Sequence, residues 1–218
     1  MDGVAYVYCG NVFPNVRFKA DWKSFLEVSG YEAFTCLAPG SRVKDGGEPP
    51  IERDAAGKPL WAWKRDTAHL GTRELMKLMD GGKVGAGGGW PLTYDADTKQ
   101  PINLSLASVQ YNAFRKKYVG IGVQVWGKSS MLGEVYYAEA DKPEGPWPWV
   151  KKVVTHDRYS FYNPVQHPFF EQEGGRLIYF EGTYATTFSR PDKEATPRYD
   201  YNQVMYRLDL SDPRLKLP

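Results

Sequence analysis

Residues that could carry acid–base chemistry are concentrated between His156 and Tyr184. This stretch holds two of the three histidines, His156 and His167. It also holds the carboxylates Asp157 and Glu181. Imidazole and carboxyl side chains can transfer protons near neutral pH, and both can bind a ligand through hydrogen bonds. The stretch is therefore the first place to look for a functional site.

A pair of carboxyl groups would point to glycoside hydrolysis, in which one group is the acid and the other, about 5–10 Å away, is the base or nucleophile. Glu181 is the first candidate for the acid, because it ends an expected strand beside the polar loops. Asp157 is its candidate partner, and Glu134 is a third candidate at the start of another expected strand. Two of them have structural alternatives, since Glu181 could pair with an arginine such as Arg198 and Asp157 could cap a turn.

The two histidines admit other interpretations. His167 lies between Gln166 and Pro168 and is either a ligand contact or a core histidine with a backbone partner. His156, Asp157 and His167 could also suggest a metal, but a separation of eleven residues between the histidines is not a known ligand pattern. We therefore predict no metal site and no cofactor, with a structural ion in a central channel as the alternative.

The elements that must position these residues are mostly strands. Aromatic residues make up 15% of the chain, and 22 glycines and 16 prolines provide frequent turns, which together favour an all-β protein. Apolar runs on both sides of Gly174–Gly175 predict a β-hairpin that carries His167 and Glu181. Strands are expected at 4–9, 31–37, 60–64, 104–114, 118–126, 133–140, 149–154, 165–170, 177–181 and 202–210.

Two short helices are expected among these strands. Asp21 is a candidate cap for the first, which would end at Gly30. Thr72 is a candidate cap for the second, over 72–79. This second helix falls in a polar stretch, approximately 41–103, that we interpret as an insertion.

The N-terminal segment predicts an incomplete hairpin. Asp2-Gly3 is a strong hairpin-turn dipeptide, yet no strand precedes it, so we expect the first strand to be missing. If the strands at 4–9 and 31–37 pair directly, Cys9 does not lie opposite Cys36. The two cysteines are then expected to be buried thiols and not a disulfide.

Charge and hydropathy exclude two classes of partner. Lys and Arg are scattered and the net charge is +2, so no basic stripe indicates nucleic-acid binding. The sequence has no run of about 18 apolar residues, so no membrane partner is expected. No signal peptide is visible, and the localisation stays unassigned. A signal peptide upstream of Met1 would make the protein secreted or periplasmic.

Strand patterns repeat along the chain. Residues 135–143 can be laid over 204–213, and residues 3–38 fit the same order of turn, strand, long loop and strand. A repeated four-stranded antiparallel meander is the sequence signature of a β-propeller blade. We therefore predict a partial β-propeller of about three blades, as a single domain over 1–218 whose N-terminal part is missing. Open blade edges would allow self-association.

Two segments carry a family resemblance. Residues 118–147, with Gly133-Glu-Val-Tyr-Tyr-Ala-Glu-Ala-Asp-Lys-Pro-Glu-Gly-Pro-Trp147, and residues 163–184 resemble blades of the arabinanase-like five-bladed propellers. That superfamily comprises glycosidases and related carbohydrate-active proteins. The resemblance implies a glycan-binding rim and acids on the inner parts of the blades. The family's first-blade acid has no counterpart here, because the innermost strand that would carry it is not found.

In such a blade, the loops at one end of the strands form a shared rim. Planar aromatic rings and hydrogen-bonding groups there would suit an oligosaccharide or polysaccharide. We expect glycan binding, with glycoside hydrolysis if the carboxylates pair. The alternatives are a non-catalytic carbohydrate-binding or scaffold propeller, and an inactive fragment. The residues expected to contact the ligand are Asn11, Arg17, Trp126, His156, Arg158, Tyr159, Asn163, His167, Tyr184 and Arg198.

Overall fold

The computed structural model describes residues 3–10, 14–43, 49–85, 92–127, 131–156, 158–189 and 200–218. The chain forms two compact units, Met1–Gly87 and Gly88–Pro218. Strands make up most of the regular structure, so the all-β prediction is confirmed. The grouping of both units into one domain stays a prediction.

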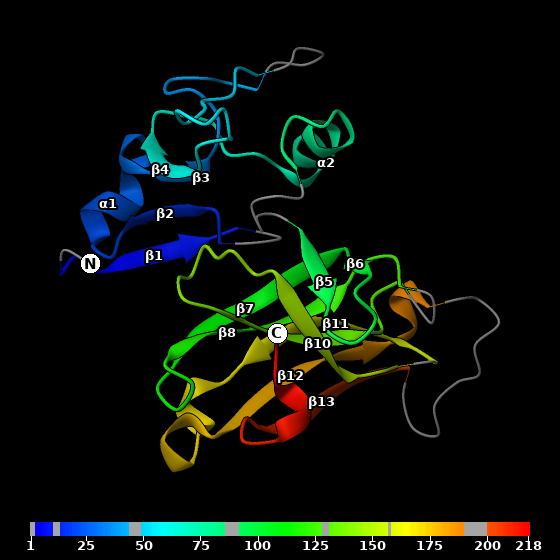
Figure 1. The fold of residues 1–218 in the computed structure, drawn as a ribbon. Coiled ribbons are helices and arrows are strands. Elements are labelled where there is room, and N and C mark those ends of the chain that lie inside the picture. The colour runs from blue at the N-terminus through cyan, green and yellow to red at the C-terminus, as the bar shows by residue number, and fades with distance from the viewer. Residues whose placement is uncertain are drawn as a thin grey trace. The chain divides into compact units, whose positions relative to one another are not determined.

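The first unit contains a four-stranded antiparallel meander in chain order (Figure 1). Its strands are β1 (Tyr6–Cys9), β2 (Val16–Lys19), β3 (Glu32–Thr35) and β4 (Ala62–Arg65). The predicted direct pairing of 4–9 with 31–37 is wrong, because β2 lies between these strands and pairs with both. The prediction of two buried thiols is wrong for Cys9, which lies opposite Val16 and is exposed, whereas Cys36 is buried as predicted. Both are free thiols, and burial raises the pKa of Cys36 to about 11.

The helical elements of this unit lie near their predicted positions. They are α1 (Trp22–Leu26), a 3-10 turn (Val28–Gly30) and α2 (Thr72–Asp80). The Asp21 carboxylate caps α1 by accepting a hydrogen bond from the Ser24 backbone N–H at 2.8 Å. The predicted cap of α2 is wrong by one residue, since Gly71 occupies the cap position and Thr72 is the first helical residue.

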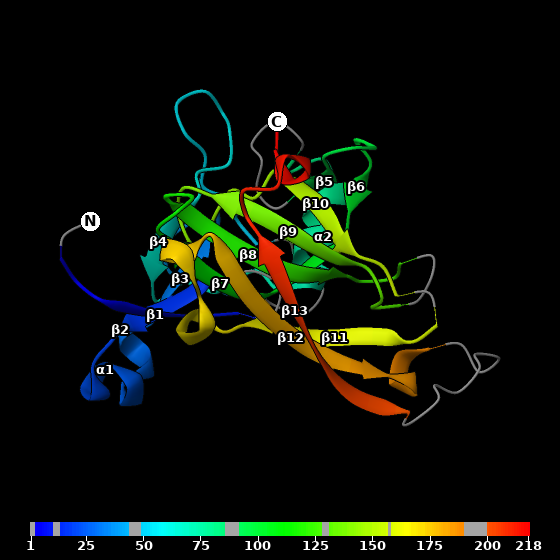
Figure 2. The same ribbon diagram turned by 90° about the horizontal axis from the view of Figure 1, so that it is seen from below.

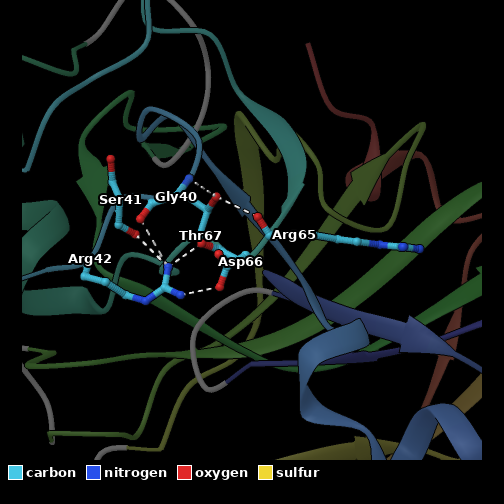
Figure 3. Close-up of polar contacts among 6 residues, drawn as sticks. All are labelled: Gly40, Ser41, Arg42, Arg65, Asp66 and Thr67. Carbon is cyan, nitrogen blue, oxygen red and sulfur yellow. Dashed lines mark hydrogen bonds and ion pairs between the residues drawn. The ribbon is translucent and has the colours of Figure 1, made fainter.

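A polar network joins the segment after β3 to the end of β4 (Figure 3). Arg42 donates hydrogen bonds to the backbone and side-chain oxygens of Asp66. The Thr67 hydroxyl accepts from the Gly40 backbone N–H at 3.0 Å and donates to the Arg65 carbonyl at 2.8 Å. These contacts tie the first part of the long connection between the two strands to the residues at and just after the end of β4.

The second unit contains a sheet with the strand order β6-β5-β10-β9-β8-β7. Its strands are β5 (Thr93–Asp95), β6 (Pro101–Ile102), β7 (Leu104–Asn112), β8 (Lys117–Gln124), β9 (Val135–Ala140) and β10 (Trp149–Val154). Strands β7 to β10 form an antiparallel meander, and β5 pairs with β10 in parallel. The range 41–103, interpreted from sequence as an insertion, therefore contributes β4 to one sheet and β5 and β6 to another.

A second, three-stranded antiparallel sheet follows in the order β11-β12-β13 (Figure 2). Its strands are β11 (Ser160–Gln166), β12 (Leu177–Ala185) and β13 (Tyr201–Asp209). The predicted hairpin exists, but its first strand ends at Gln166 and residues 168–170 form a 3-10 turn. Strand β11 lies against β7 and β8, where the Gln166 backbone N–H donates to the Ser108 hydroxyl at 3.0 Å.

The core of the second unit is filled by apolar side chains from both sheets. Its buried members are Val119, Ile121, Val123, Val135, Tyr137, Phe161, Ile178, Phe180, Leu210 and Leu215. Packing is tight where β12 passes Phe161. A Cβ atom at Gly182 would lie 2.5 Å from the Phe161 ring, so the ring occupies space that any larger residue would need.

Candidate functional site

The rim is defined here by the described residues of 125–134, 154–160 and 184–200, at one end of the second unit's sheets. Hydrogen bonds hold these segments together. The Phe161 backbone N–H donates to the Leu132 carbonyl at 3.0 Å, and the His156 backbone N–H donates to the Gly133 carbonyl at 3.1 Å. The Tyr159 hydroxyl donates to Asp200 Oδ1 at 2.9 Å. The structure thus brings together loops that are far apart in sequence.

His156 is the structural centre of the rim. Its Nδ1 atom lies 2.8 Å from the Gly133 carbonyl oxygen, and its Nε2 atom lies 2.9 Å from the Tyr206 hydroxyl. A carbonyl oxygen only accepts, so Nδ1 carries a proton, and in the neutral ring Nε2 accepts from Tyr206. The imidazole stacks on Phe161 with centroids 4.5 Å apart and is only 7% exposed. These contacts match a buried, positioning histidine.

Two tyrosines continue this ring cluster. Tyr159 is fully buried and its ring centroid lies 5.0 Å from that of Tyr184. Tyr184 is half-buried and lies 5.4 Å from the His156 ring. Burial, with a smaller effect of Tyr184, raises the pKa of Tyr206, which keeps its hydroxyl protonated as a donor. The cluster gives the rim a rigid base of packed rings.

Three of the predicted ligand contacts in this part of the second unit are exposed. Trp126 is 72% exposed, and its backbone N–H donates to the Met131 carbonyl at 2.8 Å within the loop between β8 and β9. Arg158 is exposed. Asn163 is also exposed and has a positive φ of 53°, where β11 shifts register between Tyr162 and Val165. Trp126 therefore offers a flat, accessible ring.

Glu134 is buried just before β9. Its Oε2 atom lies 2.7 Å from Lys152 Nζ and accepts a hydrogen bond from the Thr155 hydroxyl at 2.9 Å. The side chain is only 6% exposed. Because Val135 and Tyr137 face the core between the sheets, the alternation of strand side chains directs Glu134 to the other face of its sheet.

Glu181 lies on β12 and is separated from Glu134 by both sheets. Phe180 faces the core, so Glu181 projects from the opposite, outer face of the three-stranded sheet. Its Oε1 atom lies 3.2 Å from His167 Nε2, without the alignment of a hydrogen bond. His167 itself follows β11 and packs beside Phe169 and Phe170, so its predicted place inside the strand is wrong by one residue. The structure does not bring Glu181 and Glu134 together.

The remaining candidates lie in the first unit or outside the described residues. Arg17 lies in the first unit, where its Nε donates to Glu32 Oε2 at 2.7 Å and its guanidinium covers the rings of Tyr6 and Trp63. Burial is the largest single effect on its pKa and lowers it, but hydrogen bonds and charge interactions with Glu32 and Tyr8 together outweigh burial and raise the pKa of Arg17. The predicted residues Asn11, Asp157 and Arg198 lie outside the described residues.

The part of the chain that the structure describes has neither a metal-binding cluster nor a membrane-spanning helix. It contains no group of three or more His, Cys, Asp or Glu side chains arranged to hold a metal ion. Within the same residues, no helix has the length and apolar character needed to cross a membrane. Comparison with known protein families, curated protein sequences and solved structures finds no match.

Several rim contacts come from residues that sequence reasoning did not select. Tyr206, Phe161 and Lys152 contact His156 or Glu134 directly. Alternation along β13 does indicate that Tyr206 faces inward. It does not indicate that its hydroxyl meets a histidine fifty residues earlier, because that contact depends on how the two sheets pack.

Proposed function

We propose that the protein binds a glycan at the rim, on a scaffold of propeller-like blades. The blade arrangement is supported by three successive antiparallel meanders, β1 to β4, β7 to β10 and β11 to β13. After the last strand of one meander, β10, the chain returns to β11, which lies against the first two strands of that meander. Such a return from the outer to the inner edge is typical of consecutive blades.

The exposed ring of Trp126 is the observation on which the binding proposal depends. Sugars present C–H faces that pack on flat aromatic rings and hydroxyls that need hydrogen-bonding partners. Arg158 and Asp200 are exposed polar groups of the same rim. The buried ring cluster around His156 holds the rim in place before any ligand arrives, which lowers the entropy cost of binding.

Glycoside hydrolysis by Glu181, Asp157 and Glu134 is the second candidate function. A hydrolase needs two carboxyl groups on either side of one glycosidic bond. Glu134 and Glu181 project from the outer faces of two different sheets, which does not favour these two carboxylates as a catalytic pair. Binding without cleavage is therefore the proposal that the described contacts support best.

Titration of the full chain with neutral oligosaccharides of arabinose, xylose and galactose, followed by calorimetry, tests this proposal. We expect Trp126→Ala to weaken binding about tenfold, as the loss of one ring–sugar contact would. Trp22→Ala is the matched control, because Trp22 is 76% exposed but lies in the first unit. Equal binding by wild type and Trp126→Ala would contradict the proposal. Cleavage that is lost in Glu181→Gln or Glu134→Gln would instead establish hydrolysis.

A further inference from the structure

A cleft lies at the other end of the same strands. Its volume is about 760 Å³, within the range of small-ligand pockets. Its walls come from the start of β8, the end of β9, the turn before β10 and the segment after β13. The rim lies at the opposite end, where β8 ends and where β9 and β13 begin. The six residues of β9 separate the rim from the cleft by about 20 Å. We call this second feature the basic cleft.

A buried carboxylate fixes an arginine on the wall of the basic cleft. Glu139 is 8% exposed, and its Oε1 atom accepts hydrogen bonds from Arg115 Nε at 2.5 Å and from the Tyr137 hydroxyl. The hydrogen bond to Glu139 raises the pKa of Arg115, with a smaller opposing effect of burial. Asn112 accepts from the Arg115 backbone N–H at 2.9 Å, so the residue is held at both ends.

The acids of the basic cleft are all neutralised. Glu139 has Arg115, Asp141 lies 3.3 Å from Lys117 Nζ, and Asp212 lies 2.5 Å from Arg214 Nη2. Two further cations line the cleft, Lys142 and Lys216, and neither forms an ion pair with any residue that the structure describes. The lining side chains comprise four cations and three carboxylates, and Arg214 offsets Asp212 from outside the lining, so the cleft has an excess of positive charge that favours an anion.

The rest of the lining is apolar and ring-bearing. Pro146, Pro148, Trp149 and Leu217 contribute to the walls. Trp149 is half-buried, and the Lys99 ammonium lies 4.5 Å from its ring centroid, which fixes the indole. A ligand that suits this cleft has an acidic group for the lysines and a ring with C–H faces for the indole and prolines.

We propose that the basic cleft binds an acidic sugar, whose carboxylate or sulfate group is held by Lys142 and Lys216 and whose ring packs on Trp149. The proposal that the ligand is a sugar rests on the glycan-binding function proposed above. The proposal that the ligand is an anion depends only on the charges of the cleft. The acidic sugar would occupy a site separate from the rim, so one chain could contact a glycan at two places.

Nuclear magnetic resonance of the full chain with 15N-labelled tryptophan can separate the two sites. The indole N–H signal of Trp149 reports on the basic cleft, and that of Trp126 reports on the rim. We expect trigalacturonate and galactose 6-sulfate to shift the Trp149 signal. The neutral trisaccharide trigalactose should leave it unchanged, and inorganic sulfate should shift it only at much higher concentration.

Charge variants supply the control. Lys142→Gln combined with Lys216→Gln should weaken trigalacturonate binding about tenfold, because two charge-assisted contacts are lost. The matched variant, Lys77→Gln with Lys116→Gln, removes two exposed lysines outside the cleft and should bind as the wild type does.

The outcomes distinguish the two proposals. No Trp149 shift with either acidic sugar, or wild-type affinity in the Lys142/Lys216 variant, would overturn the basic-cleft proposal. Equal affinity for inorganic sulfate would overturn its sugar component. A Trp149 shift without any Trp126 shift would support the cleft and count against glycan binding at the rim.

Discussion

The rim and the basic cleft lie at opposite ends of the same strands, and their polar groups are satisfied in different ways. At the rim, ring packing fixes His156 and Tyr159. The hydrogen-bond partners of His156 are neutral, and the one charged partner is Asp200, which accepts from the Tyr159 hydroxyl. In the basic cleft, paired charges fix the wall and two lysines are left over. Binding at the rim should therefore depend on ring surface and tolerate salt, whereas binding in the cleft should weaken as salt screens the lysines.

Removing the Glu139 carboxylate should have the largest effect and should affect only the cleft end. In Glu139→Ala, Arg115 and the Tyr137 hydroxyl lose their shared acceptor. We expect a loss of about 3 kcal/mol in the free energy of unfolding. This value is at the lower end of the range for breaking a buried ion pair, because the Arg115 side chain is partly exposed. Urea unfolding measures the loss, and the Trp149 signal should move while the Trp126 signal stays.

Glu27→Ala is the control for that variant, since Glu27 pairs with Lys23 at 3.9 Å and both side chains are exposed. Exposed i,i+4 pairs contribute less than about 1 kcal/mol. An equal loss of stability in the two variants would contradict the assignment of Glu139 as the anchor of the cleft wall.

Gly182→Ala should disturb the rim and spare the cleft. The new Cβ would lie 2.5 Å from the Phe161 ring, which stacks on His156. Overpacking of this kind costs about 1–3 kcal/mol. Thermal unfolding tests the loss, with Gly30→Ala as the control because no atom lies within 4 Å of a Cβ at that position. A stable Gly182→Ala variant with an unchanged Trp126 signal would show that the rim does not depend on this packing.

Tyr159→Phe should have a smaller effect on the rim. It removes the hydroxyl that donates to Asp200 and leaves the buried ring in place. The expected loss is about 1 kcal/mol, the usual net contribution of one hydrogen bond. Tyr162→Phe is the matched control, because the Tyr162–Tyr201 hydroxyl contact is exposed and water can replace it. If both variants lose the same stability, burial does not distinguish the two hydroxyls.

Acid should affect the cleft end through Asp212. Hydrogen bonds from the Arg214 side chain and backbone lower the pKa of Asp212 to about 2, compared with about 3.9 in an unfolded chain. Because the folded pKa is the lower one, the stabilising contribution is complete above about pH 4 and is lost as the pH falls toward about 2. Unfolding measured between pH 5 and pH 2 should show a shallower decline for Asp212→Asn. An identical decline would indicate that Asp212 plays no part.

Local signals in the sequence predicted local structure well. Asp21 and Gly30 marked α1 because capping depends on a few neighbouring residues. Alternating apolar residues marked β7 to β10. Strand β2 was missed, since four residues inside a polar loop give too short a pattern. The run at 168–170 is apolar but begins with Pro168, and it forms a 3-10 turn instead of a strand.

The candidate site was harder to predict because its contacts join distant parts of the chain. The sequence selected His156, Tyr159 and Tyr184, which do meet at the rim. It also grouped Glu181 with Glu134, although strand alternation about the shared core directs them to opposite faces. Which residues face each other across two sheets depends on strand register and sheet order, and a single sequence contains no direct record of either.

The parallel pairing of β5 with β10 has a consequence for solubility. An unpaired outer strand is a template onto which another chain can add by backbone hydrogen bonding. Strand β5 occupies that edge of β10, and its pairing places Tyr94 opposite Trp149. The short segment formed by β5 and β6 thus acts as a cover for the outer strand. Its deletion would expose β10 and should promote intermolecular strand addition and aggregation.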